Sequence, residues 1–326
     1  MSRRLTLLAV LALALAAPWI VPAYRTQLSF LWVMIVFALT WDTLGGQTGY
    51  NSFGNVVFFG VGMYACAVIQ RDLELGYLTE LFGGMAAGAI LAVALAAILG
   101  SGLLGLRGHY FAIATLGLGI AAGEFASGWD YVGAGSGMVT PLYPGEIGVR
   151  ETFFYYLLLA LAAITLPALG WLYSGRFGLA LNAIRDDEEK AEAMGLHTAL
   201  YKTTAWCVAA FFLGATGAVV GNLIGFIDPR DVAFAGPTYG VWMVLMAILG
   251  GKGTLWGPVV GATVFHLTQE LFWTYLLGWQ RVALGLLIVV IVLFFPRGIL
   301  GWIRERWPER FGHAVDEAAA AEGGEG

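Results

Sequence analysis

Ten apolar runs follow one another along the chain, separated by polar or glycine-rich segments. We expect each to be helical, because a helix satisfies its own backbone hydrogen bonds in lipid, and none alternates as β-barrel strands do. The eighth run is short, as a tilted, broken or re-entrant element would be. The pattern predicts an all-α, polytopic membrane protein of about ten transmembrane helices, at Leu5–Val21, Leu28–Leu44, Ser52–Gln70, Leu81–Leu106, Tyr110–Ser127, Phe153–Tyr173, Thr203–Ile227, Thr238–Leu249, Leu255–Leu276 and Val282–Phe295.

The composition agrees with this pattern. Of the 326 residues, 59% are hydrophobic and 12% are charged, and the mean hydropathy is +0.77. Ordinary soluble domains contain about 25% charged residues, so the composition excludes that class. We expect residues 1–313 to form a single membrane domain, and residues 314–326, which carry four acids among Ala and Gly, to be a disordered acidic tail.

The first apolar run allows two interpretations. Arg3 and Arg4 precede Leu5–Ala17, and Ala14-Leu15-Ala16 resembles a signal-peptide cleavage site. The alternative is an uncleaved first transmembrane helix that ends near Pro18 and Pro22, which we favour. Both interpretations place residues 24–27 on the outer side of the membrane, so the distribution of charge does not distinguish them.

Orientation follows from the positions of Lys and Arg, which concentrate in cytoplasmic segments. Basic residues gather at the N-terminus, in the internal segment 176–202 and after residue 297. Six runs before that segment and four after it place all three on the cytoplasmic side. We therefore expect cytoplasmic N- and C-termini and an external segment Gly128–Thr152.

Arg185–Glu192 holds seven charges in eight residues. Around it, Leu181, Ile184, Ala191 and Met194 recur at helical spacing, which predicts one amphipathic helix over Arg176–Met194, with Ser174 as N-cap and Gly195 after its end. Its net acidity disfavours anionic lipid as the partner, because like charges repel. We interpret the helix as a docking site for a soluble protein.

Motifs for enzyme chemistry are missing from the sequence. Gly251-Lys252-Gly253 lacks the first Gly and the Ser or Thr of an ATP-binding loop. The four histidines are scattered, and Cys66 and Cys207 lie in apolar runs. We therefore expect no catalytic residue, no metal site, no cofactor bound by this chain and no nucleic-acid partner.

A glycine-rich break, Gly45–Asn55, separates two apolar runs and contains several uncharged hydrogen-bonding side chains. One interpretation is a tight cytoplasmic turn with close helix packing through Gly45 and Gly49. The other is a broken helix that lines a substrate path, with Gln47, Tyr50, Asn51, Ser52 and Asn55 as pathway residues. A second break at 250–254 also follows Leu-Gly-Gly, which hints at an internal repeat.

Three acidic residues fall in or near predicted spans: Asp42, Glu124 and Glu270. A charge at a helix centre costs roughly 2.5–3.5 kcal/mol on insertion scales, so each should face a partner, a cavity or the membrane interface. Glu124, near the outer end of its span, is a further candidate pathway residue.

Several long segments together resemble a known family, the M-type permease subunit of branched-chain amino-acid (Liv) ABC importers, over roughly residues 28–301. The segments are 107–116 (RGHYFAIATL), 49–64 (GYNSFGNVVFFGVGMY), 175–196 (GRFGLALNAIRDDEEKAEAMGL), 249–261 (LGGKGTLWGPVVG) and 294–301 (FFPRGILG). The chain departs from the family pattern at Asn55, where many relatives have His, and at Glu124, about one turn later than expected.

The resemblance implies a permease in the bacterial cytoplasmic (inner) membrane. Its partners would be two cytoplasmic ATPase subunits that use ATP, a paralogous second permease, an external solute-binding protein and the lipid bilayer. Residues 174–202 would be the coupling segment. The positions matching the family's ATPase-coupling residues are Arg185, Asp186, Asp187, Glu188, Ala191, Met194 and Gly195.

The cargo stays open at this point between branched-chain or other hydrophobic amino acids and the urea, amides or aromatic acids that related permeases carry. A secondary transporter or channel that works without an ATPase is the rival of a different class. It would show a line of intramembrane acids or a pore motif, and neither is visible in the sequence.

Overall fold

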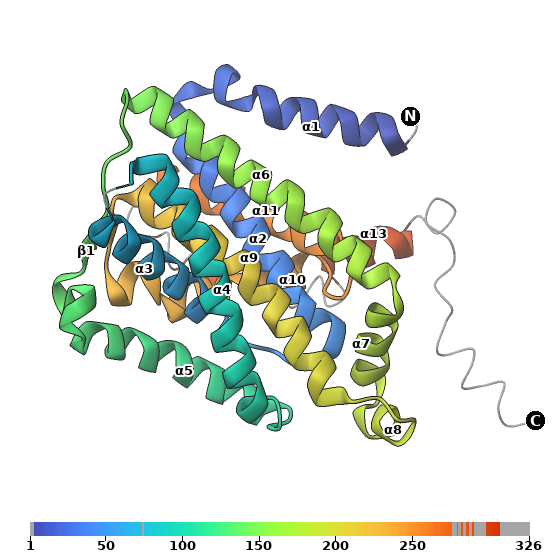
Figure 1. Ribbon diagram of the computed structural model, residues 1–326. Coiled ribbons are helices and arrows are strands. Elements are labelled where there is room, and N and C mark those ends of the chain that lie inside the picture. Colours follow the sequence, from blue (N-terminus) through green and yellow to red (C-terminus); the bar gives the residue numbers. More distant parts are fainter. Residues whose placement is uncertain are drawn as a thin grey trace, which may run out of the picture.

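The computed structural model describes residues 3–73, 75–275 and 298–306, together with residues 279, 282, 285, 286 and 289. Most of the predicted span Val282–Phe295 and the whole predicted tail 314–326 lie outside these residues. The helices are α1 (Arg3–Ile20), α2 (Arg25–Thr48), α3 (Val56–Asp72), α4 (Tyr77–Leu103), α5 (His109–Gly128), α6 (Ile147–Ser174), α7 (Arg176–Asp186), α8 (Glu188–Ala193), α9 (Thr198–Ile224), α10 (Val241–Gly250), α11 (Gly257–Tyr275) and α13 (Gly298–Arg306) (Figure 1).

Each of the nine predicted runs that falls in the described residues contains a helix. Six helical stretches of this part are long and apolar enough to cross a membrane: Pro22–Thr48, Tyr77–Leu103, His109–Gly128, Ile147–Ser174, Thr198–Ile224 and Pro229–Gly250. The all-α, polytopic membrane class is therefore confirmed, whereas the count of about ten spans is not. Pro229–Gly250 includes two π-helical turns, η4 (Pro229–Ala233) and η5 (Gly236–Gly240), so only the ten residues of α10 are α-helical.

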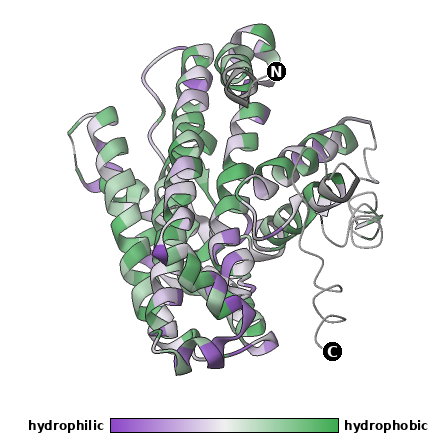
Figure 2. Cartoon of the chain, turned by 90° about the vertical axis from the view of Figure 1, so that its right-hand side faces the viewer, coloured by the Kyte–Doolittle hydropathy of each residue, from purple (hydrophilic) through white to green (hydrophobic). Residues whose placement is uncertain are grey.

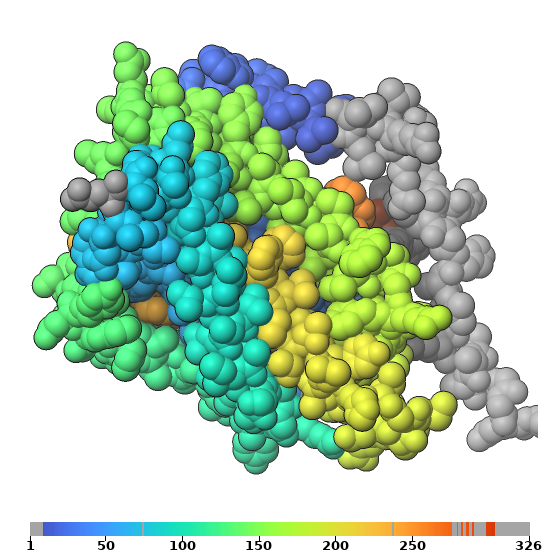
Figure 3. All heavy atoms as spheres, in the orientation of Figure 1, coloured from blue at the N-terminus to red at the C-terminus, as the bar shows by residue number. Residues whose placement is uncertain are grey.

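The centre of the bundle is α9, which packs most extensively against α4 and α3 and also against α2 (Figure 1). In the space-filling view, α9 (yellow) lies directly beside α4 (cyan) (Figure 3). Small residues allow this close packing. A side chain at Gly62 would come within 1.9 Å of the backbone oxygen of Gly214, and one at Gly217 within 2.0 Å of that of Phe59. Glycines at helix contacts let the backbones approach closely, which is how membrane helices associate without a hydrophobic driving force between them.

The two ends of the bundle differ in polarity. Hydrophilic residues gather around α7, α8 and the adjoining helix ends, while the helix bodies are mostly hydrophobic (Figure 2). The opposite end carries a two-residue antiparallel pair, β1 (Met138–Val139) with β2 (Phe226–Ile227), in which Met138 lies opposite Ile227. This pair ties the segment after α5 to the end of α9.

Candidate functional site at the α8 end of the bundle

The prediction of a single helix over Arg176–Met194 is wrong, because the chain forms two helices there, α7 and α8. Asp187 lies between them with an extended backbone (φ −163°, ψ 104°), and its Oδ1 accepts a hydrogen bond from the N–H of Lys190 at 3.0 Å. Asp187 is thus the N-cap of α8. The Lys190 hydrogen bonds also hold the pKa of Asp187 below its usual value.

The expected caps of the predicted helix have mixed outcomes. Ser174 does not cap α7, because its hydroxyl donates back to the oxygen of Trp171 and Gly175 occupies the N-cap. Gly195 does have the left-handed backbone expected after a helix end, with φ of 89°.

The apolar stripe of the coupling segment faces mainly inward. Leu181 and Ile184 are buried within the chain, and Ala191 is 5% exposed, whereas Met194 is 85% exposed. These apolar residues therefore attach α7 and α8 to the bundle, and of them Met194 alone is open to a partner. We call the outward side of this segment the outer face; it consists of Arg185, Asp186, Glu189, Lys190, Glu192, Met194 and Gly195.

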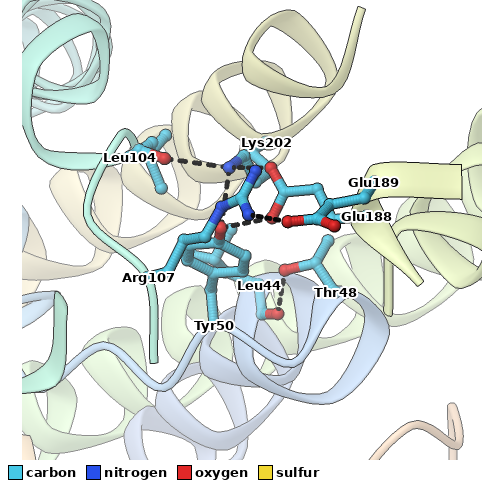
Figure 4. A network of polar contacts seen from close by, with 8 residues as sticks. All are labelled: Leu44, Thr48, Tyr50, Leu104, Arg107, Glu188, Glu189 and Lys202. Atoms are coloured by element: carbon cyan, nitrogen blue, oxygen red, sulfur yellow. Dashed lines mark hydrogen bonds and ion pairs between the residues drawn. The ribbon is translucent and has the colours of Figure 1, made fainter. Parts of the chain in front are cut away.

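Below the outer face, Glu188 joins a buried ion cluster (Figure 4). The ammonium of Lys202, on α9, donates to Glu188 Oε1 at 2.6 Å, to the Tyr50 hydroxyl at 2.9 Å and to the oxygen of Leu104 at 2.8 Å. Tyr50 in turn donates to Glu188 Oε2. The side chain of Lys202 is 3% exposed and that of Glu188 is 15% exposed. The cluster connects α8, α9, the α4–α5 turn and the chain after α2.

The protonation states follow from this arrangement. Burial acts to raise the pKa of Glu188, but hydrogen bonds from Lys202 and Tyr50 and the charge of Lys202 outweigh it and hold that pKa below its usual range. Burial and the neighbouring carboxylate raise the pKa of Tyr50, so the phenol keeps its proton and remains a donor. Arg107 makes a second, exposed ion pair with Glu189 at 2.7 Å.

Residues 49–55, here called the crossing segment, run from Tyr50 in this cluster into the bundle. Helix α2 ends at Thr48, and Gly49 has the left-handed φ of 79°. The crossing segment is irregular rather than a tight turn, and α3 begins only at Val56. Irregular backbone inside a membrane bundle needs hydrogen-bond partners from the protein, because little water reaches it. They are Thr115, whose hydroxyl accepts from the N–H of Phe53, and Trp41, whose indole donates to the oxygen of Ser52.

The predicted pathway residues of this region have separate environments. Gln47 is buried and donates to Asp42 at 3.3 Å. Ser52 is buried, while Asn51 is exposed. Asn55 is fully buried; its Oδ1 accepts from the indole N–H of Trp206 at 2.8 Å, and its Nδ2 has no hydrogen-bond partner in the described part of the chain. Tyr50, Ser52 and Asn55 thus each have a hydrogen-bond partner within the protein, and their role as pathway residues stays a prediction.

The second glycine-rich break lies against the first. The N–H of Gly253 donates to Asp42 Oδ1 at 2.7 Å. A side chain at Gly46 would come within 2.6 Å of the Gly253 nitrogen, and one at Gly253 within 3.4 Å of the Arg185 guanidinium. The buried acid Asp42 therefore joins both breaks, next to the end of α7.

Glu124 does not belong to this site. It lies on α5 near the opposite end of the bundle, where it pairs with Arg230. The sequence-based interpretation also missed Lys202, Thr115 and Trp206, which come from distant helices. Lys202 was visible as a basic residue next to an apolar run, but its neighbours were not. Within the described ranges, His, Cys, Asp and Glu side chains form no group of three suited to a metal ion.

Comparison with known proteins identifies the family. The model of the family described as "Branched-chain amino acid transport system / permease component" matches residues 25–295. The chain is 26% identical to the high-affinity branched-chain amino acid transport system permease protein LivM of Escherichia coli K12, over 98% of this chain and 80% of that protein.

Two other relatives extend the comparison. The probable branched-chain amino acid transport permease protein LivM of Methanocaldococcus jannaschii is 24% identical over 82% of this chain and 78% of its own length. The LivH permease of E. coli K12 is 26% identical over 44% of each chain. No solved structure gives a significant match. The resemblance drawn from the sequence is thus confirmed, and the chain belongs to the family of permease components of branched-chain amino acid transport systems.

Proposed function

We propose that this chain is the membrane-spanning permease subunit of an ATP-driven importer of branched-chain amino acids. The observation that carries the proposal is the family match over residues 25–295, joined to relatives along almost the whole chain whose names specify this cargo. The relatives do not favour urea, amides or aromatic acids. The energy would come from separate ATPase subunits, and this chain would catalyse no reaction.

The proposed partners follow the same reasoning. The chain resembles both LivM and LivH, two permeases named for one kind of system, which supports pairing with a paralogous permease. Two cytoplasmic ATPases and an external solute-binding protein complete the proposed assembly in the bacterial inner membrane.

The α8 end of the bundle is the proposed cytoplasmic side. Six of the fourteen Lys and Arg residues in the described ranges lie at this end: Arg107, Arg176, Arg185, Lys190, Lys202 and Lys252. The opposite end holds four: Arg25, Arg71, Arg150 and Arg230. Positive residues concentrate on the cytoplasmic side of membrane proteins. The outer face would then meet the ATPases, with both chain termini on the same side, and the segment after α5 would lie outside.

The proposed coupling passes through the buried ion cluster. A partner that moves the outer face displaces Glu188, and Glu188 is bound to both Lys202 of α9 and Tyr50 of the crossing segment. Because the cluster is buried and fully paired, shifting one member favours shifting the others. The crossing segment and α9 would thus change position together as the importer alternates between two packings.

Uptake into proteoliposomes tests the function. The complex of this chain, its paralogue, the ATPases and the loaded binding protein should accumulate leucine, isoleucine and valine only when ATP is supplied to the ATPase side. Vesicles that lack the ATPases serve as the control. Accumulation of leucine without ATPases, or of urea and benzoate in place of leucine, would contradict the proposal.

A further inference from the structure

The end of the protein opposite α8 contains a cavity that the proposed coupling does not use. Its volume is about 290 Å³, and it lies between α5 and the π-helical turns η4 and η5. Such turns are rare and occur frequently at functional sites. The lining residues are Ile120, Gly123, Glu124, Arg230, Asp231, Phe234, Ala235 and Thr238.

Both signs of charge meet in this cavity. The Arg230 guanidinium donates to Glu124 Oε2 at 2.7 Å, and the two side chains are 62% and 57% exposed. An ion pair so exposed contributes little to stability, because water and salt screen it. Each group can therefore exchange its partner for a charged group of a bound molecule at small cost. Asp231 adds a second carboxylate, and Asp228 fixes the turn by accepting the N–H groups of Arg230 and Asp231.

The inner wall of the cavity is apolar and is shared with a larger cavity. Phe234 lines the 290 Å³ cavity and also one of about 600 Å³, whose walls are apolar and aromatic residues of α3, α4, α5 and the segment after α5. Tyr64 lines the larger cavity and stacks on Phe234, with ring centroids 5.9 Å apart. The Tyr64 hydroxyl is buried and has no hydrogen-bond partner among the described residues. Phe234 thus separates a charged space from an apolar one.

We propose that the cavity at Glu124, Arg230 and Asp231 binds a zwitterionic amino acid with an apolar side chain. The guanidinium of Arg230 would bind the carboxylate, the acids would bind the ammonium group, and the side chain would contact Phe234. A cation and an anion held beside an apolar wall match the three parts of such a ligand. This inference rests on the proposed function and names where its substrate binds.

The test uses the assembled importer with a photoreactive diazirine analogue of leucine. Labelled peptides should contain residues 120–124 or 230–238, and excess leucine should suppress the labelling while 4-methylpentanoate, which lacks the ammonium group, should not. Arg230→Gln should lower both labelling and leucine uptake about tenfold, as expected on losing a charge-assisted contact. Arg71→Gln is the matched control, because Arg71 forms an exposed pair with Asp72 and does not line the 290 Å³ cavity; its contact with Tyr131 is at the larger cavity.

The double variant Glu124→Arg with Arg230→Glu separates ligand binding from structure. It retains an ion pair at these positions but exchanges the two charges, so leucine uptake should stay low. Recovery of uptake to the wild-type level would show that the pair is merely structural and would overturn the site. If the wild-type importer takes up leucine and the Arg230→Gln variant takes it up equally well, this site is overturned while the proposed function stands. A different result would make this surface a docking site for the binding protein. In that case, a higher concentration of binding protein would restore both uptake and the stimulation of ATP hydrolysis in the Arg230→Gln variant. Failure of wild-type uptake would contradict the proposed function and this site with it.

Discussion

At the scale of single residues, Lys202 carries the clearest energetic argument. It is a cation almost without solvent contact, and its Glu188 partner is mostly buried as well. Taking two charges out of water is costly, so the pair adds little net stability as a unit, but removing one partner strands the other. The cluster therefore specifies how α8 sits on α9 more than it strengthens the fold.

Replacing Lys202 with Met should destabilise the protein by about 3–5 kcal/mol, because the mostly buried Glu188 carboxylate then loses its cation. Thermal unfolding in detergent measures this. Arg107→Gln breaks the exposed Arg107–Glu189 pair nearby and should change stability by less than about 1 kcal/mol. Equal effects of the two substitutions would show that the Lys202 pair is not buried as described.

Glu188 should make stability depend on pH in an acidic window. Its pKa is lowered in the folded protein, so its contribution is complete well above the ordinary value of 4.5 and disappears as the pH falls through the lower, folded value. The difference in unfolding temperature between wild type and Glu188→Gln should shrink as the pH drops below about 4.5. Carboxylates common to both proteins cancel in this difference. A constant difference down to pH 3 would contradict the prediction.

At the scale of elements, the sequence was informative where a pattern is local and long. Apolar runs predicted the helices because the lipid requirement acts on each run separately. The break at Asp187 was not predictable, because the surrounding charges are compatible with one continuous helix and the N-cap geometry depends on how Leu181 and Ala191 pack. The spacing that suggested a docking stripe was real, but burial against the bundle and docking on a partner require the same apolar pattern.

The outer face gives a prediction about α8 that distinguishes these two uses. Met194→Asp should weaken co-purification of the ATPase subunits without lowering the unfolding temperature of the permease, because Met194 is exposed. Ala191→Asp should destabilise the permease itself, since it places a charge in a buried contact. Leu142→Asp, at an exposed apolar residue of the opposite end, should leave both properties unchanged. Retention of the ATPases by the Met194 variant at full stoichiometry would show that α8 does not dock them.

At the scale of the whole molecule, the two ends of the bundle have complementary features. One end holds the outer face, the ion cluster and the meeting point of the two glycine-rich breaks. The other holds the short β1–β2 pair and the Glu124–Arg230 cavity. Helices α5 and α9 extend between these ends, so a displacement at α8 has a continuous packed route to the far side. The position of Glu124 near the outer end of its span was predictable, but its pairing with Arg230, 106 residues away in the sequence, depends on the fold.

The proposed orientation predicts which end is accessible from each side of the membrane. Single cysteines at positions 194 and 142 are suitable probes, because both native side chains are exposed. Met194 follows α8 and Leu142 lies shortly after β1, and these two elements are at opposite ends of the bundle (Figure 1). The native Cys66 and Cys207 are first replaced by Ala, a small change at buried or half-buried positions. A membrane-impermeant maleimide should label position 142 in right-side-out vesicles and position 194 in inside-out vesicles. We expect this result because cytoplasmic segments of membrane proteins carry an excess of Lys and Arg, and basic residues gather around α8. The reverse labelling would place α8 outside, where no ATPase could reach it, and would contradict the coupling proposal as a whole.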